Sequence, residues 1–187
     1  MNFGRKFDVA FAKLIELEGS KYVDDPYDHG GATKFGLSKK FLDAHFKKDV
    51  SKETIESFTI EQAKEIYYDA FWKANNLESI NNPKIVTLIF ICEVHLGSFV
   101  ANVLLQHAIN DLAEYFDLKK VEVDGIIGKN TLDCLNDFCV KNDRQLLIDK
   151  IYIYHIVNRY RKLASNFGQS EYLLGWINRL YKIDSRT

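Results

Sequence analysis

Apolar residues recur three and four positions apart along most of the chain, which is the spacing of one buried helix face. The first such stretch spans residues 5–18 and is followed at once by Gly19, a common helix terminator. Further stretches predict helices at 38–45, 59–72, 84–96, 99–116, 129 or 130 to 140, 144–167 and 172–181. We therefore predict a mainly α fold.

The helical pattern is interrupted twice. Residues 19–34 are rich in Gly, Asp and Pro, which predicts an irregular loop or a short hairpin. The asparagines within 75–82 precede Pro83 and mark the second break. We place a boundary there, between an N-terminal lobe, 1–83, and a C-terminal helical region, 84–187.

The composition argues against several function classes. Aromatic residues make up 13% of the 187 residues and only 2 are prolines, so the chain can bury a core rather than remain disordered. The net charge is −1, which gives no overall attraction to an anionic polymer, so we expect no nucleic-acid partner. The 3 cysteines and 5 histidines follow neither a disulfide framework nor a zinc motif.

The longest apolar run, 85–105, is predicted to form a buried central helix. It contains Glu93, His95 and Asn102, and such groups are costly inside a bilayer, so we expect no membrane span. Gly97 marks either a break in this helix or a point of close packing. The N-terminal residues carry charges throughout and lack the apolar core of a signal peptide, so we expect synthesis in the cytoplasm without one.

The loop after the first helix concentrates the candidate chemistry. Glu18 ends that helix, where partial burial and the negative helix end both favour the protonated carboxyl that a general acid needs. Asp28 can activate water or stabilise a cationic transition state, although Asp24 and Asp25 lie close by and an Asx turn is its ordinary role. Thr33 can orient the water or simply bond within the loop. Together these parts are typical of an acid-catalysed glycoside hydrolase.

Other residues are candidates for substrate contacts. Tyr22 can stack on a sugar ring or anchor the loop to the core, and Gly31 can give the loop one fixed shape. Glu93 and His95 are either substrate contacts or structural groups with separate partners, since positions two apart face different sides of a helix. One helix face also carries three amides that either line a cleft or form polar surface: Asn102, Gln106 and Asn110.

The stretch from Glu18 to Leu37 resembles the signature of glycoside hydrolase family 108, the N-acetylmuramidase family of lysozyme-like proteins. The matching residues are Glu18-Gly19, Tyr22-Val23, Asp25-Pro26, Asp28, Gly30-Gly31, Thr33 and Gly36-Leu37, with one extra residue between Gly19 and Tyr22. Individually weaker likenesses cover most of the remaining chain. They are the stretch from Glu65 to Trp72, the runs Leu105–Ala108 and Val123–Leu132, which look like the family's predicted peptidoglycan-binding region, and Gly175–Arg179.

The resemblance implies a lysozyme-like, two-lobe helical fold with a long buried central helix and an irregular or short hairpin active-site loop. It implies hydrolysis of the β-1,4 bond between N-acetylmuramic acid and N-acetylglucosamine, with no metal or organic cofactor. Glu18 would be the general acid, Asp28 a base or electrostatic stabiliser, and Thr33 the residue that positions water. The implied partner is the peptidoglycan glycan strand, reached at the cell wall or periplasm by signal-independent export or lysis.

One segment departs from the family pattern. The family usually carries Asp and Asn where this chain has Ile91 and His95, within Phe90–Gly97. If that helix lines the substrate cleft, the substrate contacts have changed. The alternative interpretation is therefore a non-catalytic peptidoglycan-binding or secretion-associated protein on the same fold, although an intact Glu18–Thr33 motif argues against it.

Overall fold

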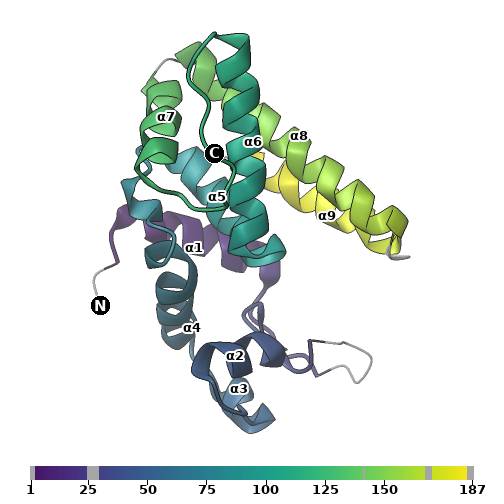
Figure 1. The fold of residues 1–187 in the computed structure, drawn as a ribbon. Coiled ribbons are helices and arrows are strands. Elements are labelled where there is room, and N and C mark those ends of the chain that lie inside the picture. The colour runs from purple at the N-terminus through teal and green to yellow at the C-terminus, as the bar shows by residue number, and fades with distance from the viewer. Residues whose placement is uncertain (1–2, 25–29, 141, 167–169, 185–187) are drawn as a thin grey trace. The chain divides into compact units, whose positions relative to one another are not determined.

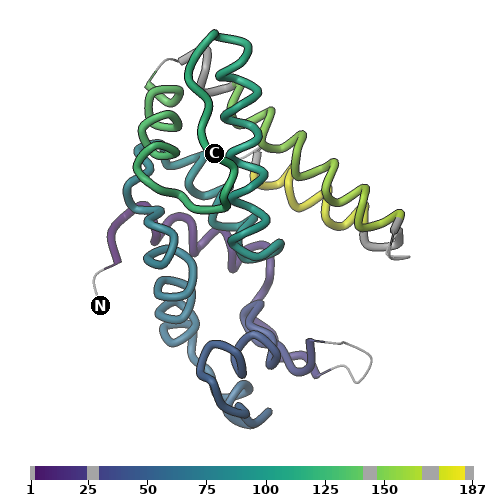
Figure 2. The backbone as a smooth tube through the Cα atoms, in the orientation of Figure 1, coloured from purple at the N-terminus to yellow at the C-terminus, as the bar shows by residue number. Residues whose placement is uncertain are grey.

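The computed structural model describes residues 3–24, 30–140, 142–166 and 170–184. Within these ranges the chain is mainly α-helical, as predicted, with one short antiparallel hairpin (Figures 1 and 2). In chain order the elements are α1 (Arg5–Glu18), β1 (Thr33–Lys34), β2 (Leu37–Ser38), α2 (Lys39–Phe46), α3 (Lys52–Ser57), α4 (Ile60–Tyr67), the π-helix η1 (Tyr68–Lys73), the 3₁₀-helix η2 (Leu77–Ser79), α5 (Pro83–Leu96), α6 (Ser98–Tyr115), α7 (Lys129–Val140), α8 (Asn142–Asn166) and α9 (Ser170–Asp184).

The chain divides into two compact units, Met1–Ala74 and Asn75–Thr187. The boundary expected from the sequence, between residues 83 and 84, falls inside the second unit. As a boundary between functional domains, it stays a prediction.

The first unit is built around an aromatic cluster between α1 and the α4–η1 segment. α1 buries Phe7, Ala10, Phe11 and Leu14 on one face, at the helical spacing that predicted it. The Phe7 ring lies 5.2 Å from the Trp72 ring, and Phe11 lies 6.0 Å from Tyr67, measured between centroids. Aromatic contacts of this kind add to the apolar burial that holds α1 in place.

The α4 segment begins and ends for different reasons. The Thr59 hydroxyl accepts from the Gln62 backbone N–H, and the Gln62 side chain accepts from the Thr59 N–H, so the two residues form a capping box. The predicted helix over 59–72 is confirmed in extent, but it changes to a π-helix after Tyr67. The sequence did not predict α3, whose six residues bury only Ile55 and are too short to show a period.

The second unit has α5 as its most buried element. Every residue from Ile85 to Glu93 is buried, so the apolar run serves a protein core. Gly97 breaks the run: its φ is 82°, its N–H donates to the Glu93 carbonyl over 2.9 Å, and α6 begins at Ser98. Of the two expectations for Gly97, the helix break is the correct one. α6 packs on α5 and α8, and α9 runs beside α8 (Figure 1).

The three amides on α6 hold a loop. The Gly125 N–H donates to Gln106 Oε1 over 2.8 Å, and Asn102 Nδ2 donates to the Gly125 carbonyl over 3.1 Å. Asn110 makes two bonds with the Val121 backbone, of 2.8 and 2.9 Å. These side chains satisfy backbone groups that have no strand or helix to pair with. Neither sequence interpretation, a cleft lining or a polar surface, describes them.

No helix in the described ranges is both long and apolar enough to span a membrane.

Candidate active site

Glu18 is the last residue of α1, and a backbone hydrogen bond from Gly19 closes the end of this helix. The Gly19 N–H donates to the Ile15 carbonyl over 2.9 Å, and Gly19 has a φ of 80°, which turns the chain away from the helix axis. The Glu18 side chain is half-buried. The carboxyl predicted to act as general acid therefore sits at the C-terminal end of α1, where the helix dipole is negative.

The hairpin β1–β2 lies against Glu18. Thr33 pairs with Ser38 and Lys34 with Leu37. The two residues between the strands, Phe35 and Gly36, have φ values of 53° and 80°, as a type I′ turn requires. A Cβ placed on Gly36 would lie only 2.9 Å from Glu18 Cγ. The turn backbone thus passes directly over the Glu18 side chain, and only glycine leaves room for it.

Tyr67 of α4 completes this contact from the other side. Its side chain is buried, and its hydroxyl donates to the Phe35 carbonyl over 3.0 Å. The same hydroxyl would lie 2.8 Å from a Cβ on Gly36. Burial, and secondarily the charge of Glu18, raise the pKa of Tyr67, so it remains a neutral hydrogen-bond donor. It holds Phe35 in a positive φ that a bulky residue rarely adopts.

Thr33 begins the strand that leads into this turn. Its backbone exchanges two hydrogen bonds with Val23, of 2.8 and 2.9 Å, which close the loop that follows α1. Its hydroxyl donates to the Gly31 carbonyl over 3.2 Å. That bond uses the hydroxyl proton and leaves its oxygen lone pairs as acceptors. The water-positioning role of Thr33 stays a prediction, and Asp28 lies outside the described residues.

Two further candidates near this loop, Tyr22 and Asp24, lie among charged side chains. Tyr22 is half-buried, and its pKa is raised by desolvation and by the negative charges of Asp24 and Glu56. Asp24, the alternative to Asp28, forms an ion pair with Lys52 over 2.8 Å. The Asp24 carboxylate therefore has a structural partner in this conformation. Sugar stacking by Tyr22 stays a prediction.

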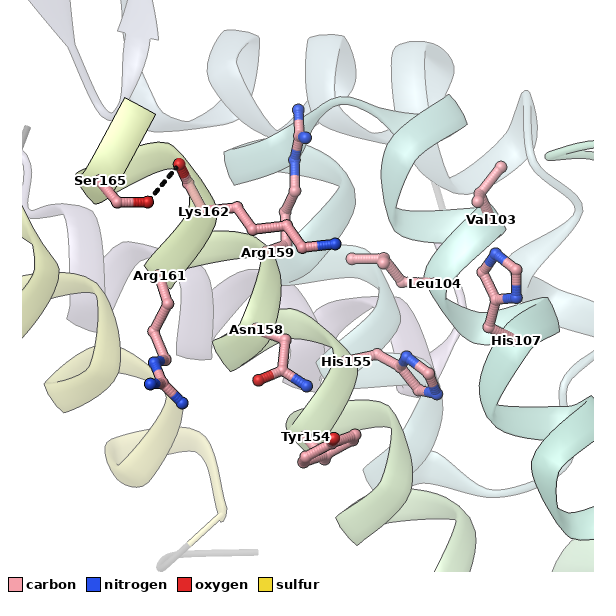
Figure 3. A pocket seen from close by; sticks show the side chains of 10 residues that line it. All are labelled: Val103, Leu104, His107, Tyr154, His155, Asn158, Arg159, Arg161, Lys162 and Ser165. Atoms are coloured by element: carbon pink, nitrogen blue, oxygen red, sulfur yellow. Dashed lines mark hydrogen bonds between the residues drawn. The ribbon is translucent and has the colours of Figure 1, made fainter. Parts of the chain in front are cut away.

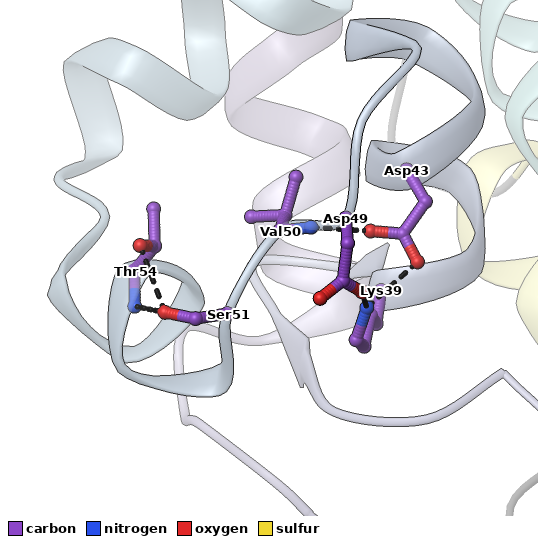
Figure 4. A network of polar contacts seen from close by, with 6 residues as sticks. All are labelled: Lys39, Asp43, Asp49, Val50, Ser51 and Thr54. Carbon is purple, nitrogen blue, oxygen red and sulfur yellow. Dashed lines mark hydrogen bonds and ion pairs between the residues drawn. The ribbon is translucent and has the colours of Figure 1, made fainter.

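A polar network at α2 holds the base of the loop (Figure 4). Lys39 Nζ bridges Asp43 and Asp49 at 2.7 and 2.5 Å, and Asp43 accepts from the Val50 N–H over 2.7 Å. The hydrogen bonds to Asp43 and Asp49 raise the pKa of Lys39. The Lys39 backbone N–H in turn donates to the Ala32 carbonyl over 2.7 Å, which ties the network to the residue before Thr33.

Gly31 should be needed for its backbone conformation. Its φ is 73°, and an added Cβ would lie 3.3 Å from Lys39 Cβ. We expect Gly31→Val to cost about 1–3 kcal/mol of stability and to lower activity by more than that loss explains, because Val resists positive φ. Gly31→Asn is the matched control, since Asn also adds a Cβ but tolerates this region. Turnover and thermal melts decide it, and full activity in Gly31→Val would show that the loop does not need glycine.

Glu93 belongs to a buried polar cluster of the second unit. Its side chain is fully buried, and its Oε2 accepts from Asn75 Nδ2 over 3.1 Å. Asn75 Nδ2 also contacts Ser98 Oγ at 3.0 Å. Glu93 Oε1 and the Oδ1 of neighbouring Asn102 are buried without a hydrogen-bond partner. If Glu93 Oε1 carried a proton, it could donate to Asn102 Oδ1. Neither of these buried oxygens would then lack a hydrogen-bond partner.

These surroundings bear on the predicted substrate role of Glu93 and His95. Glu93 offers no exposed atom to a substrate in this conformation, and its observed partners are structural. His95 is half-buried. Ile91, which stands where the family usually carries Asp, is fully buried and serves the core. Substrate contact by Glu93 and His95 stays a prediction.

Burial raises the pKa of Glu93 to about 8, above the ordinary value of 4.5. The folded protein therefore holds a proton on Glu93 that the unfolded chain releases above pH 4.5, so this group's stabilisation is complete below that pH and is lost as pH rises toward 8. We expect the melting temperature of the wild type to fall from pH 5 to pH 8 relative to Glu93→Gln. The difference in unfolding free energy between the two proteins should change by up to about 1.4 kcal/mol per pH unit. A wild type that gains stability over this variant as pH rises would contradict it.

Two family models match consecutive parts of the chain. The model of glycosyl hydrolase 108 matches residues 11–97, which include the second part of α1 with Glu18, the hairpin and α4. Residues 11–97 are a glycosyl hydrolase 108 domain. The model of a predicted peptidoglycan domain matches residues 100–181, which include most of α6 and all of α7 and α8. The chain is therefore a glycoside hydrolase, and the pairing of the two domains implies that it hydrolyses peptidoglycan.

The fold is also found in a solved structure. The structure of Brucella abortus SagA matches with a TM-score of 0.74 and 26% sequence identity, over 96% of this chain and 92% of that one. The likeness therefore extends through both matched domains of the chain. No curated protein matches it.

Sequence reasoning missed two residues of the candidate site. Gly36 and Tyr67 appeared only within stretches that resemble the family, and neither was given a role. A glycine at the second position of a two-residue hairpin turn is a signal for positive φ that could have identified Gly36. Within the described ranges, no three His, Cys, Asp or Glu side chains are grouped so that they could hold a metal ion.

Proposed function

We propose that the protein is an N-acetylmuramidase that cleaves the β-1,4 bond between N-acetylmuramic acid and N-acetylglucosamine in peptidoglycan. The observation that carries the proposal is the placing of Glu18: a half-buried carboxyl at a helix end, packed under a glycine turn that Tyr67 fixes. The glycosyl hydrolase 108 domain contains Glu18, the turn residue Gly36 and Tyr67. The proposed site of action is the bacterial cell wall.

In the proposed reaction Glu18 protonates the leaving glycosidic oxygen. The helix end favours the protonated carboxyl before the reaction, and the turn restricts the rotamers of its side chain. Asp28 acts as base or stabilises the oxocarbenium-like transition state, and Thr33 offers a hydroxyl oxygen to the attacking water. Tyr67 is a positioning residue, because its hydroxyl contacts the turn carbonyl and its burial excludes it from proton transfer.

We expect the reducing ends released from purified peptidoglycan to be muramic acid. The expectation follows from the bond assigned to this enzyme, since a muramidase leaves the muramic acid residue with the free anomeric carbon. Mass spectrometry of borohydride-reduced digests identifies the reduced sugar. Glucosaminyl ends, anhydro-muramic products or cleaved peptides would each assign the protein to another class of wall-degrading enzyme.

A further inference from the structure

A basic groove lies between α6 and α8, inside the predicted peptidoglycan domain. Its volume is about 730 Å³, and Figure 3 shows Lys162 reaching across it toward Leu104 while the imidazoles of His107 and His155 lie close together. We call it the α6–α8 groove. The side chains that line it are Val103, Leu104, His107, Tyr154, His155, Asn158, Arg159, Arg161, Lys162 and Ser165.

The charge of this groove differs from that of the whole chain. Its lining includes three cations, Arg159, Arg161 and Lys162, and no carboxylate, whereas the chain carries a net charge of −1. Positions 155, 159 and 162 on α8 are four and three residues apart, so they share one helix face. The cationic character is therefore local, which favours an anionic group bound at this place over general attraction to a polyanion.

The cations of the groove have unused hydrogen-bonding capacity. Arg159 Nε is buried and has no hydrogen-bond partner. Among the described residues, no ion pair involves the side chains of Arg159, Arg161 or Lys162. Arg159 also lines the groove, and a guanidinium binds most strongly to a carboxylate or a phosphate through its fork of N–H groups.

His155, which lines the groove, already contacts a carboxylate that lies outside the lining. Its Nε2 lies 2.8 Å from Asp111 Oδ2, and its ring is stacked 5.9 Å from the His107 ring. This pair fixes one wall of the groove and leaves Arg159 and Lys162 for an external ligand. The apolar part of the lining, Val103 and Leu104, suits small methyl-bearing residues next to such an anion.

We propose that the α6–α8 groove binds the free carboxylates of the stem peptides of peptidoglycan. The inference rests on the proposed function, which makes peptidoglycan the substrate. In this polymer the acidic groups are the carboxylates of the stem peptides, whereas the sugars are neutral. The groove would then recognise the peptide part of the substrate, and the glycosyl hydrolase 108 domain would act on the glycan part. Removal of the peptide charge should weaken attachment to the wall without changing the cleavage chemistry.

The test is a sedimentation assay of the full-length protein with insoluble peptidoglycan. All proteins carry Glu18→Gln so that the polymer stays intact, and the polymer is used native or with its carboxylates amidated. We expect amidation and Lys162→Glu each to weaken binding about fivefold or more, because each removes a charge pair. Lys182→Glu, at an exposed position of α9, makes the same charge change outside the groove and should bind as before.

Further measurements separate loss of binding from loss of folding and from general attraction to anions. Arg159→Gln is a second variant in case Lys162→Glu does not fold, and thermal melts check both. A free stem tetrapeptide should compete for binding at concentrations where inorganic phosphate does not. Equal binding by Lys162→Glu and Lys182→Glu, or competition by phosphate alone, would overturn the proposal. Reducing ends released by the protein with Glu18 intact report separately on the proposed function, so a failure of either can be told from the other.

Discussion

Glu18→Gln should fold like the wild type and lose about 10²–10⁴-fold of its peptidoglycan hydrolysis, the usual contribution of a general acid. Glutamine keeps the shape of the side chain under the Gly36 turn but has no acidic proton to give to the leaving oxygen. Zymography on purified peptidoglycan and release of reducing ends measure the loss, and thermal melts check the fold. Since a carboxyl packed against a turn and a buried tyrosine is well positioned, the effect should appear in kcat rather than in substrate binding.

Glu16→Gln is the matched control for this result. Glu16 lies in the same last turn of α1, half its side chain is exposed, and it forms an ion pair with Lys13 over 3.2 Å. Exposed pairs of this kind contribute about 0–1 kcal/mol, so the control should keep nearly full activity. Equal activity in a folded Glu18→Gln protein would remove Glu18 from the mechanism, whereas no hydrolysis by the wild type would favour the non-catalytic interpretation.

The helices could be predicted where long amphipathic stretches end in recognisable residues. α1 has a clear apolar face and ends at Gly19, and α4 begins with the Thr59–Gln62 capping box. Each signal is local, because the residues that cause it are within one turn of one another. α3 gave no such signal, and the π-helix after Tyr67 depends on how η1 packs rather than on its own residues.

The contacts of the candidate site could not be predicted, because they join residues far apart in the chain. The family signature named Glu18, Thr33 and Gly36, but spacing alone does not show that the Gly36 backbone lies on Glu18. The position of Tyr67 behind this turn depends on the packing of α4 against α1. Likewise, the sequence singled out Glu93 as a carboxylate within an apolar run. It could not show that the partner of Glu93 is Asn75, which is 18 residues away.

Gly36→Ala should damage both the stability and the activity of the enzyme. The φ of 80° costs an L-residue about 1–2 kcal/mol, and a Cβ 2.8 Å from Tyr67 Oη and 2.9 Å from Glu18 Cγ adds about 1–3 kcal/mol of overlap. Relief of this overlap must move the turn, Tyr67 or Glu18. A displacement of about 1 Å at a catalytic group can cost 10²-fold in rate. We therefore expect hydrolysis to fall about 10²-fold in the folded fraction.

Gly97→Ala separates backbone strain from this collision. Gly97 has a φ of 82°, almost the same as Gly36, but nothing lies within 4 Å of an added Cβ. Both variants should therefore lose stability to strain, and Gly97→Ala at least as much as Gly36→Ala, because its ψ of 143° lies in a region that almost only glycine adopts. Only Gly36→Ala should lose the activity. Melting temperatures and turnover of the two proteins, measured side by side, give the comparison. If the turnover of folded Gly36→Ala were no lower than that of Gly97→Ala, the turn could shift freely over Glu18, and its close packing would not be what orients the acid.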